Sequence, residues 1–339
     1  MAMTRFKTSR GRFGTYETVA LEDTATGSKA AFVRLGGPLL AWHVPFQGKL
    51  VDVTDGFATP EELAEAKGGR AWIMAPWTNR IDGGQYEWGG ARLDLGVEDP
   101  VNRVVLHGFV KRIGCQVEAE GADGRAARVT FSVKVIRTGG FRGYPFDVDI
   151  FITYTLTPGR LDVQVTGRNV GGAAAPFCCG WHPYFKTPSR GIDGLKLTIP
   201  ARTKIVSDAR LLPLPGDAAR RPIQEAPEFD FRPGSARGNL VGGQVVDASF
   251  ADLAADADGW LRTRVEDPAS GMKITVFQER GLMHVFTGDT LGRRPRNALA
   301  LEPIEVLTNA FNRPECRDAI TLAPGAERSF RFGVEVASS

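Results

Sequence analysis

The stretch that decides the fold is Val148-Asp-Ile-Phe-Ile-Thr-Tyr-Thr-Leu-Thr157, followed by Pro158-Gly-Arg-Leu-Asp-Val-Gln-Val165. Apolar side chains occupy every second position, which is typical of half-buried antiparallel strands. Gly and Pro supply the turns that such strands need. The same alternation recurs in two other places, at Val129, Phe131, Val133 and Val135, and at Phe330, Phe332, Val334 and Val336.

The rest of the chain agrees with an all-β fold. The 339 residues include 40 Gly and 21 Pro and are 42% hydrophobic, so the chain can bury a large core. One helix is predicted after Thr59, where an N-cap, Pro60 and the capping-box residue Glu62 follow one another. No βαβ rhythm is present, which argues against a parallel sheet. We expect residues 208–259 to form long loops and short strands, and residues 1–339 to form one large antiparallel β-sandwich domain.

Charge and cysteine usage exclude several classes of function. The net charge of +3 comes from 42 basic and 39 acidic residues that are interspersed along the chain. The densest basic run, 293–296, contains no aromatic residue to stack on a base, so no nucleic-acid partner is expected. The N-terminus has no apolar segment, so no membrane partner is expected. The four cysteines form no C-x-x-C, which favours a reduced, cytoplasmic protein.

His182 is the first candidate for chemistry, within Gly180-Trp-His-Pro-Tyr-Phe185. Pro183 restricts the backbone of the residue before it, so the imidazole is held on a stiff segment. An imidazole with an ordinary pKa of about 6.5 exchanges protons near neutrality. The alternative is a structural histidine in an aromatic cluster, with Phe185 as the aromatic residue expected in the core.

Glu302 is the second candidate, because it interrupts the apolar run Ala298-Leu-Ala-Leu-Glu-Pro-Ile304. Glu is rarely buried without a partner or a task. Pro303 lacks a backbone donor, so we expect the strand to end or to reach a sheet edge there. The alternative is an exposed glutamate at the end of a strand.

Three further segments carry polar side chains at strand ends or in loops. Asn79-Arg80-Ile81 offers a planar guanidinium that suits sugar hydroxyls or a carboxylate, although a surface arginine in a turn is the alternative. His107 precedes a glycine, and Asp247 stands alone in an expected loop. The four histidines stand singly, so no metal site is expected, and His43 and His284 are expected to be structural.

These segments, in this order, resemble the aldose 1-epimerase (galactose mutarotase) family. The resemblance rests on N-R-I, L-H-G, H-P-Y-F, D-x-x-F and E-P, and on a turn like Leu322-Ala-Pro-Gly-Ala-Glu327 before the last strand. It extends from about Thr15 to Val336. It implies a galactose mutarotase-like supersandwich with few short helices, and an isomerase that needs no metal or organic cofactor.

The resemblance also implies roles for single residues. His182 matches the family's general acid and Glu302 its general base, while Arg80, Asn79, His107 and Asp247 match residues that bind the monosaccharide substrate. The reaction interconverts the α and β anomers of a free aldohexose through ring opening and reclosure. With ordinary pKa values of about 4.3 for Glu and 6.5 for His, both groups hold the required state between those values. We expect the nearby carboxylate to raise the protonated fraction of His182.

The chain departs from the family pattern at a few positions. Many relatives have a tryptophan about eight residues after the L-H-G histidine, where this chain has Gly114-Cys115. Ala326 occupies a position where glutamate is usual. Trp72 and Trp77 precede the N-R-I segment and are expected to reshape the floor of the pocket.

Three other functions compete with this interpretation. A mutarotase for hexose 6-phosphates or other anionic sugars would need extra cations, for which Lys111, Arg112 and Arg142 are candidates, although surface charge is their expected role. A non-catalytic sugar-binding module would need neither acid nor base. A glycosidase would need two carboxylates and would leave His182 unexplained. The sequence leaves open which sugar is bound, the pathway, and whether the protein is a monomer or a homodimer.

Overall fold

The alternating stretches form long strands in a computed structural model that describes residues 4–338. Residues 129–135 lie in β12 (Ala127–Ile136), residues 148–157 are β13 (Val148–Thr157), and residues 161–165 lie in β14 (Arg160–Asn169). The C-terminal stretch lies in β27 (Glu327–Ser338). These four strands are consecutive neighbours in one antiparallel sheet. The prediction of a large antiparallel β fold is confirmed.

Two eight-stranded sheets and one five-stranded sheet contain most of the strands. The back sheet has the order β11-β12-β13-β14-β27-β23-β22-β18. Its other members are β11 (Gln116–Ala122), β18 (Lys196–Thr198), β22 (Leu261–Glu266) and β23 (Met272–Gln278). The N-terminal sheet is a meander of β1 (Phe6–Phe13), β2 (Tyr16–Asp23), β3 (Ser28–Val33), β4 (Leu39–Phe46) and β5 (Lys49–Asp52).

The front sheet has the order β20-β19-β21-β24-β25-β16-β6, with β17 also paired to β25. Its strands are β6 (Trp72–Met74), β16 (Gly180–His182), β17 (Tyr184–Phe185), β19 (Ala201–Ile205), β20 (Arg220–Pro222), β21 (Asp247–Leu253), β24 (Leu282–Phe286) and β25 (Leu299–Ile304). Three two-stranded ribbons complete the β structure: β7 (Arg80–Asp82) with β10 (Val104–Leu106), β8 (Gln85–Trp88) with β9 (Ala91–Asp94), and β15 (Ala175–Pro176) with β26 (Thr321–Leu322).

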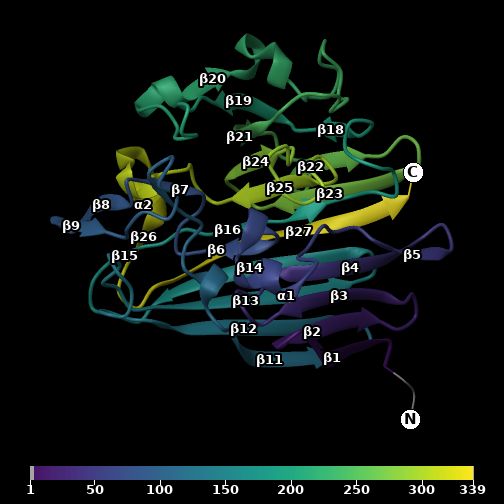
Figure 1. Cartoon of the computed structure of the whole chain (residues 1–339), viewed down its shortest axis with the longest axis horizontal. Coiled ribbons are helices and arrows are strands. Elements are labelled where there is room, and N and C mark those ends of the chain that lie inside the picture. The colour runs from purple at the N-terminus through teal and green to yellow at the C-terminus, as the bar shows by residue number, and fades with distance from the viewer. Residues whose placement is uncertain (1–3, 339) are drawn as a thin grey trace.

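One face of the back sheet is covered by the other two sheets. Tyr154, Val163 and Phe332 lie opposite one another in neighbouring strands, so they project from the same face. Phe32 of β3 stacks on Tyr154 with ring centroids 4.0 Å apart. Trp181 of β16 stacks on Phe332 at 5.8 Å. The N-terminal strands (purple in Figure 1) therefore pack beside the front sheet against the same core.

Val135 departs from the predicted pattern. We expected it to continue the buried row of Val129, Phe131 and Val133, but it is exposed, and Ile136 is buried in its place. The register between β12 and β13 shifts between Val133 and Ile136. A β-bulge adds one residue to a strand and so reverses the alternation beyond it.

Helices are few and short, as expected. They are α1 (Pro60–Ala64), α2 (Arg317–Ile320) and the 3₁₀ turns η1 (Lys67–Gly69), η2 (Val110–Arg112), η3 (Gly216–Ala219), η4 (Ile223–Glu225), η5 (Pro227–Phe229), η6 (Ala310–Asn312) and η7 (Pro314–Cys316). The predicted helix is α1, where the Thr59 hydroxyl accepts a hydrogen bond from the Glu62 backbone. Glu62 itself accepts from Ala58 N rather than from the N-cap. No helix within residues 4–338 has the length and apolar character of a membrane span.

Candidate active site

The register of the front sheet aligns polar side chains from neighbouring strands in one row. Ser249 of β21 lies opposite His284 of β24, and His284 lies opposite Glu302 of β25. Directly opposed residues of an antiparallel pair project from the same face, with Cβ atoms about 4.5–5.5 Å apart. The three side chains are therefore neighbours across the sheet.

His182 continues this row on the next strand. Gly180 of β16 pairs with Ile304, so the antiparallel register brings His182 beside Glu302 two residues further along. His182 Nε2 lies 3.3 Å from Glu302 Oε1. On its other side, His182 lies opposite Trp72 of β6. Residues that are far apart in the sequence thus form one row across five strands.

A second row lies two residues along each strand and therefore on the same face. Asp247 of β21 lies opposite Phe286, Phe286 lies opposite Ala300, and Ala300 lies opposite Tyr184 of β17. The Tyr184 ring stacks on the ring of His182, with centroids 5.1 Å apart and planes 25° apart. All members of the two rows except Ser249 and Ala300 line one cavity, of which the rows form the floor.

Asn79, Arg80 and His107 reach the cavity from the ribbon of β7 and β10. His107 N donates to the carbonyl of Asn79 at 2.8 Å. Asn79 and His107 have φ values of 52° and 57°, a left-handed conformation that residues other than glycine rarely adopt. Gly108 follows at φ 69°, and a Cβ there would lie 1.9 Å from the carbonyl oxygen of Ala75. The L-H-G glycine is therefore required where two segments cross closely.

All six residues predicted for the site line a single cavity of about 340 Å³. They are His182, Glu302, Arg80, Asn79, His107 and Asp247. Aromatic and apolar side chains complete the walls, chiefly Ala66, Trp72, Tyr184, Phe286 and Leu291. The structure thus brings the predicted residues together, although they come from segments spread over most of the chain.

Glu302 is buried in an interior strand rather than exposed at a strand end. Its exposed fraction is 1%, and β25 lies between β24 and β16 and continues past Pro303 to Ile304. The expected sheet edge at Pro303 is therefore wrong, whereas the strand does end one residue later, at Ile304. Leu301 N donates to the carbonyl of Pro183, so the N–H of Leu301 points toward β16 and β17. Backbone N–H groups alternate in direction along a strand, so Pro303, two residues later, has its missing N–H on the same side. Those strands pair with β25 only at its two ends, so no ladder bond is lost.

The polar atoms of the His182–Glu302 pair have unused hydrogen-bonding capacity. Neither carboxylate oxygen of Glu302 has a hydrogen-bond partner within residues 4–338. His182 Nδ1 also has no partner there. The 3.3 Å contact between the two side chains lacks hydrogen-bond geometry. Burying such groups unpartnered costs about 1–3 kcal/mol each, a cost that a ligand with matching hydroxyls relieves.

Burial reverses the order of the two pKa values that we expected. Burial raises the pKa of Glu302 to about 7, although the charge of His284 opposes the shift. Burial also lowers the pKa of His182 to about 3, and the charge of His284 adds to this effect. The expectation that the neighbouring carboxylate would increase the protonation of His182 is therefore wrong. At neutral pH the imidazole is neutral, and a proton that the pair binds resides on Glu302.

His284 lies in the site, contrary to the prediction that it is structural. Its Nε2 lies 2.9 Å from Asp247 Oδ1 and its Nδ1 lies 2.8 Å from Ser249 Oγ. Burial acts to lower its pKa, but Glu302 and Asp247 outweigh burial and raise it. No local motif marks His284, and only its register with Glu302 reveals it. His43 lies on β4, outside the cavity, and its side chain is exposed.

His107 is a neutral ring in contact with sulfur and aromatic groups. Its Nδ1 lies 2.8 Å from Met74 Sδ, and its ring lies 5.3 Å from that of His182 and 5.7 Å from that of Trp72. Burial and the nearby His182 hold its pKa well below the usual value. Because the thioether sulfur is only an acceptor, the contact favours the tautomer protonated at Nδ1, which leaves Nε2 as an acceptor.

Arg80 is the one arginine or lysine among the residues that line the cavity. Its Nη1 donates to Asn79 Oδ1 at 2.8 Å, while its buried Nε has no partner within residues 4–338. Lys111 is buried in an ion pair with Glu98 at 2.7 Å and does not line the cavity. Arg112 and Arg142 are exposed and pair with Glu98 and Asp94, respectively. The three cations proposed for a phosphate therefore lie elsewhere.

The aromatic residues divide between cavity and core. Trp72 lines the cavity as expected, but Trp77 is buried and packs against Phe109 and Phe311 instead. Phe185 is in the core, as predicted. Cys115 is also buried there and does not line the cavity.

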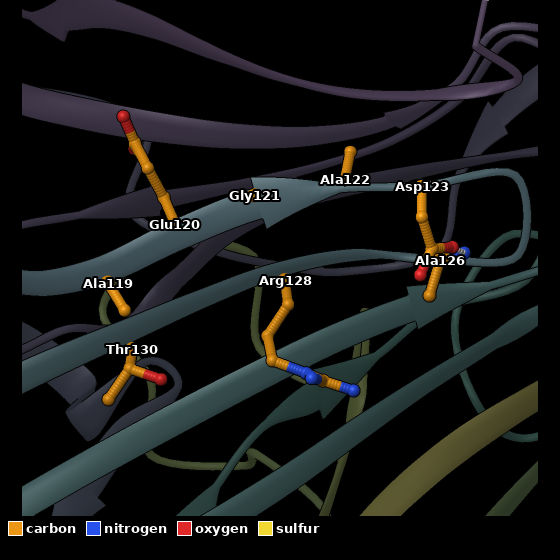
Figure 2. Close-up of a pocket in the computed structure, with 8 residues that line it drawn as sticks. All are labelled: Ala119, Glu120, Gly121, Ala122, Asp123, Ala126, Arg128 and Thr130. Atoms are coloured by element: carbon orange, nitrogen blue, oxygen red, sulfur yellow. Dashed lines mark hydrogen bonds between the residues drawn. The ribbon is translucent and has the colours of Figure 1, made fainter.

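A second hollow lies on the β11–β12 hairpin, outside the front sheet (Figure 2). Arg128, which lines it, donates to Thr155, and Asp123 accepts from the backbone of its own turn. The other lining residues are mostly alanine and glycine. This hollow has no acid–base pair, so the candidate active site is the cavity on the front sheet.

No metal cluster is formed by the described part of the chain. Within residues 4–338, no three His, Cys, Asp or Glu side chains are arranged to hold a metal ion. Independence from metals and organic cofactors stays a prediction.

Comparisons with known proteins agree with the sequence motifs. The protein-family model described as aldose 1-epimerase matches residues 17–335. Human galactose mutarotase is 27% identical over 263 residues, which are 72% of this chain and 70% of that protein. The uncharacterized protein YihR of Escherichia coli K12 is 25% identical over 254 residues, which are 75% of this chain and 74% of that protein.

Solved structures share the fold. A galactose mutarotase-like protein from Clostridium acetobutylicum superposes with a TM-score of 0.81 at 16% identity and covers 99% of each chain. A GalM/aldose epimerase homologue from C. elegans gives a TM-score of 0.78 at 18% identity, over 92% of this chain and 96% of that one. At these identities the likeness extends to the fold alone.

Proposed function

Because the chain belongs to the aldose 1-epimerase family, we propose that it is an isomerase that interconverts the α and β anomers of a free aldohexose. Glu302 acts as the base and His182 as the acid, and no metal or organic cofactor takes part. The observation that carries this proposal is the contact between a buried imidazole and a buried carboxylate, 3.3 Å apart on the floor of a cavity.

Ring opening needs one proton on the pair of side chains. Glu302 removes the proton of the C1 hydroxyl while His182 gives a proton to the ring oxygen, and the bond between C1 and that oxygen breaks. The free aldehyde rotates about C1–C2, and the reverse transfers close the ring from the other face. No covalent intermediate with the protein forms.

Ring opening moves the shared proton to the side chain on which the buried site favours it. After ring opening, the proton resides on Glu302, whose pKa burial raises to about 7, and His182 is neutral, because burial lowers its pKa to about 3. The arrangement before ring opening, with an imidazolium beside a carboxylate, is the less populated one. Its free energy above the favoured arrangement is part of the barrier.

The remaining cavity groups suit a small polyhydroxylated ring. Arg80 and Asn79 supply hydrogen-bond donors, Asp247 supplies an acceptor, and His107 supplies a ring nitrogen. A sugar hydroxyl can therefore find a partner whether it donates or accepts a hydrogen bond. Tyr184, with Trp72 and Phe286 nearby, offers aromatic surface to the C–H groups of a sugar.

The charges that line the cavity favour a neutral sugar over an anionic one. Arg80 is the sole lysine or arginine there, and two carboxylates, Glu302 and Asp247, share the cavity with it. Phosphate recognition in proteins commonly uses bidentate arginine or several cations. We therefore expect hexose 6-phosphates and acidic sugars to be poorer substrates than free aldohexoses.

Polarimetry tests the proposal directly. Freshly dissolved α-D-glucose or α-D-galactose should relax to the anomeric equilibrium faster with the protein than in buffer alone, with and without a chelator. A panel of aldoses, their 6-phosphates and uronic acids ranks the substrates. Tight binding of a sugar without any acceleration would instead support a non-catalytic binding module.

A further inference from the structure

His284 is a buried titratable group that the proposed proton transfers do not use. Its side chain is 8% exposed, and it lies between Ser249 and Glu302 in the first row across the front sheet. Both ring nitrogens are engaged, Nε2 with Asp247 Oδ1 at 2.9 Å and Nδ1 with Ser249 Oγ at 2.8 Å. The ring therefore has no free nitrogen for a substrate.

We propose that His284 is a positioning residue that fixes Asp247 and places a positive charge beside the Glu302–His182 pair, a role that rests on the proposed anomerisation. A neutral imidazole has one N–H, so it donates to only one of its two partners. An imidazolium donates to the Asp247 carboxylate and to the Ser249 hydroxyl at once. The Ser249 hydroxyl can also donate to Nδ1 of a neutral ring, so these two contacts fit either form. What favours the charged form is the position of the ring between two carboxylates, Asp247 at 2.9 Å and Glu302 directly opposite in the sheet.

The surroundings of His284 favour that charge. Burial disfavours the imidazolium, but the carboxylates of Glu302 and Asp247 outweigh burial and raise the pKa of His284. In return, the imidazolium hydrogen bond lowers the pKa of Asp247, although burial opposes this. Asp247 thus remains an acceptor for a sugar hydroxyl, held in one orientation by the ring.

The same charge acts on the pair that exchanges protons. It works against the rise in the Glu302 pKa and adds to the fall in the His182 pKa. The other charged or titratable groups that line the cavity around the pair are Asp247, Arg80, His107 and Tyr184. Among these groups, His284 is directly opposite Glu302 in the sheet register. Without the charge of His284, the Glu302–His182 pair would therefore lose its last proton only at a higher pH.

A His284→Gln variant separates the charge from the hydrogen bonds. Glutamine can donate to Asp247 and accept from Ser249 but carries no charge. We expect the pH at which kcat/KM begins to fall to move upward by about one unit, since a nearby charge shifts a pKa by about 1–3 units. At pH 9, activity relative to the variant's own plateau should then be about tenfold higher than in the wild type. An unchanged profile would overturn the proposal.

Ser249→Ala is the matched control, because it removes a partner of the ring but leaves the ring in place. We expect its profile to move by less than half the shift seen in His284→Gln. A shift of equal size in both variants would attribute the effect to disturbed packing and would overturn the role of the charge.

Imidazole NMR tests the charge without any assay of turnover. The chain has only four histidines, so each ring can be assigned from the spectrum of a variant that lacks it. His284 should remain protonated above pH 6.5 in the wild type, and Asp247→Asn should lower its titration point. A His284 ring that is neutral at pH 6.5 would overturn the proposal. Protonated His284 in a protein without anomerase activity would leave the charge intact and refute the proposed function.

Discussion

The pH dependence of anomerisation follows from the pKa values of the buried pair. The reactive form carries one proton on the Glu302–His182 pair, whichever of the two holds it at a given moment. With pKa values of about 7 for Glu302 and about 3 for His182, this form predominates between those values. We therefore expect kcat/KM to be nearly constant from about pH 5 to 6 and to fall tenfold per unit well above pH 7. At pH 9 about 1% of the plateau should remain.

The assay is polarimetric relaxation of α-D-glucose or α-D-galactose below KM, with the buffer-catalysed rate subtracted at every pH. Circular dichroism at each pH shows that the protein stays folded. A kcat/KM that instead rises through pH 7 would identify ionised Glu302 beside neutral His182 as the active form. That outcome would refute the requirement for a shared proton.

Three further predictions follow from buried groups and a close backbone crossing. Glu302→Gln and His182→Asn should each lower kcat by about 10²–10⁴, as loss of a general base or acid does; turnover near the wild-type rate in a folded variant would remove that residue from the mechanism. Glu302→Gln should also stabilise the protein. The folded-state pKa of Glu302 is raised from 4.5 to about 7, so its favourable contribution is complete below pH 4.5 and is lost as the pH rises through 7. In urea titrations the variant should gain about 3 kcal/mol at pH 8, and the gain should shrink toward pH 4.5; an equal gain at both pH values would contradict this account. Gly108→Ala should cost about 3 kcal/mol or more, because its Cβ would meet the Ala75 carbonyl at 1.9 Å. Gly124→Ala, where no atom lies within 4 Å, should change stability by less than about 0.5 kcal/mol.

The strands were predictable because their signal is local. The alternation at 148–157 and 330–336 is visible in the sequence and corresponds to long strands of the back sheet. Val135 was misassigned because a β-bulge reverses the alternation without any change in composition. Pro303 was misinterpreted because whether a missing N–H matters depends on which neighbouring strand it faces, and that neighbour is far away in the sequence.

The residues of the candidate site that belong to recognisable sequence motifs were predictable. The six predicted residues line one cavity, whereas His284 was missed. It looks like an ordinary strand residue in Leu282-Met-His-Val-Phe286, and only the pairing of β24 with β21 and β25 puts it between Asp247 and Glu302. The pKa order was also beyond the sequence, because burial of Glu302 and His182 depends on the complete tertiary structure.

The row that crosses the front sheet makes activity a measure of complete assembly. In the sequence, the members of the row extend from Trp72 to Glu302. No short segment of the chain therefore contains both the reactive pair and the residues that support it. Contacts between distant parts of a chain are slow to form, because long loops must close first. During refolding, local hairpins such as β13–β14 should recover their circular dichroism before anomerase activity returns. The delay between the two signals would measure how late in folding the front sheet assembles.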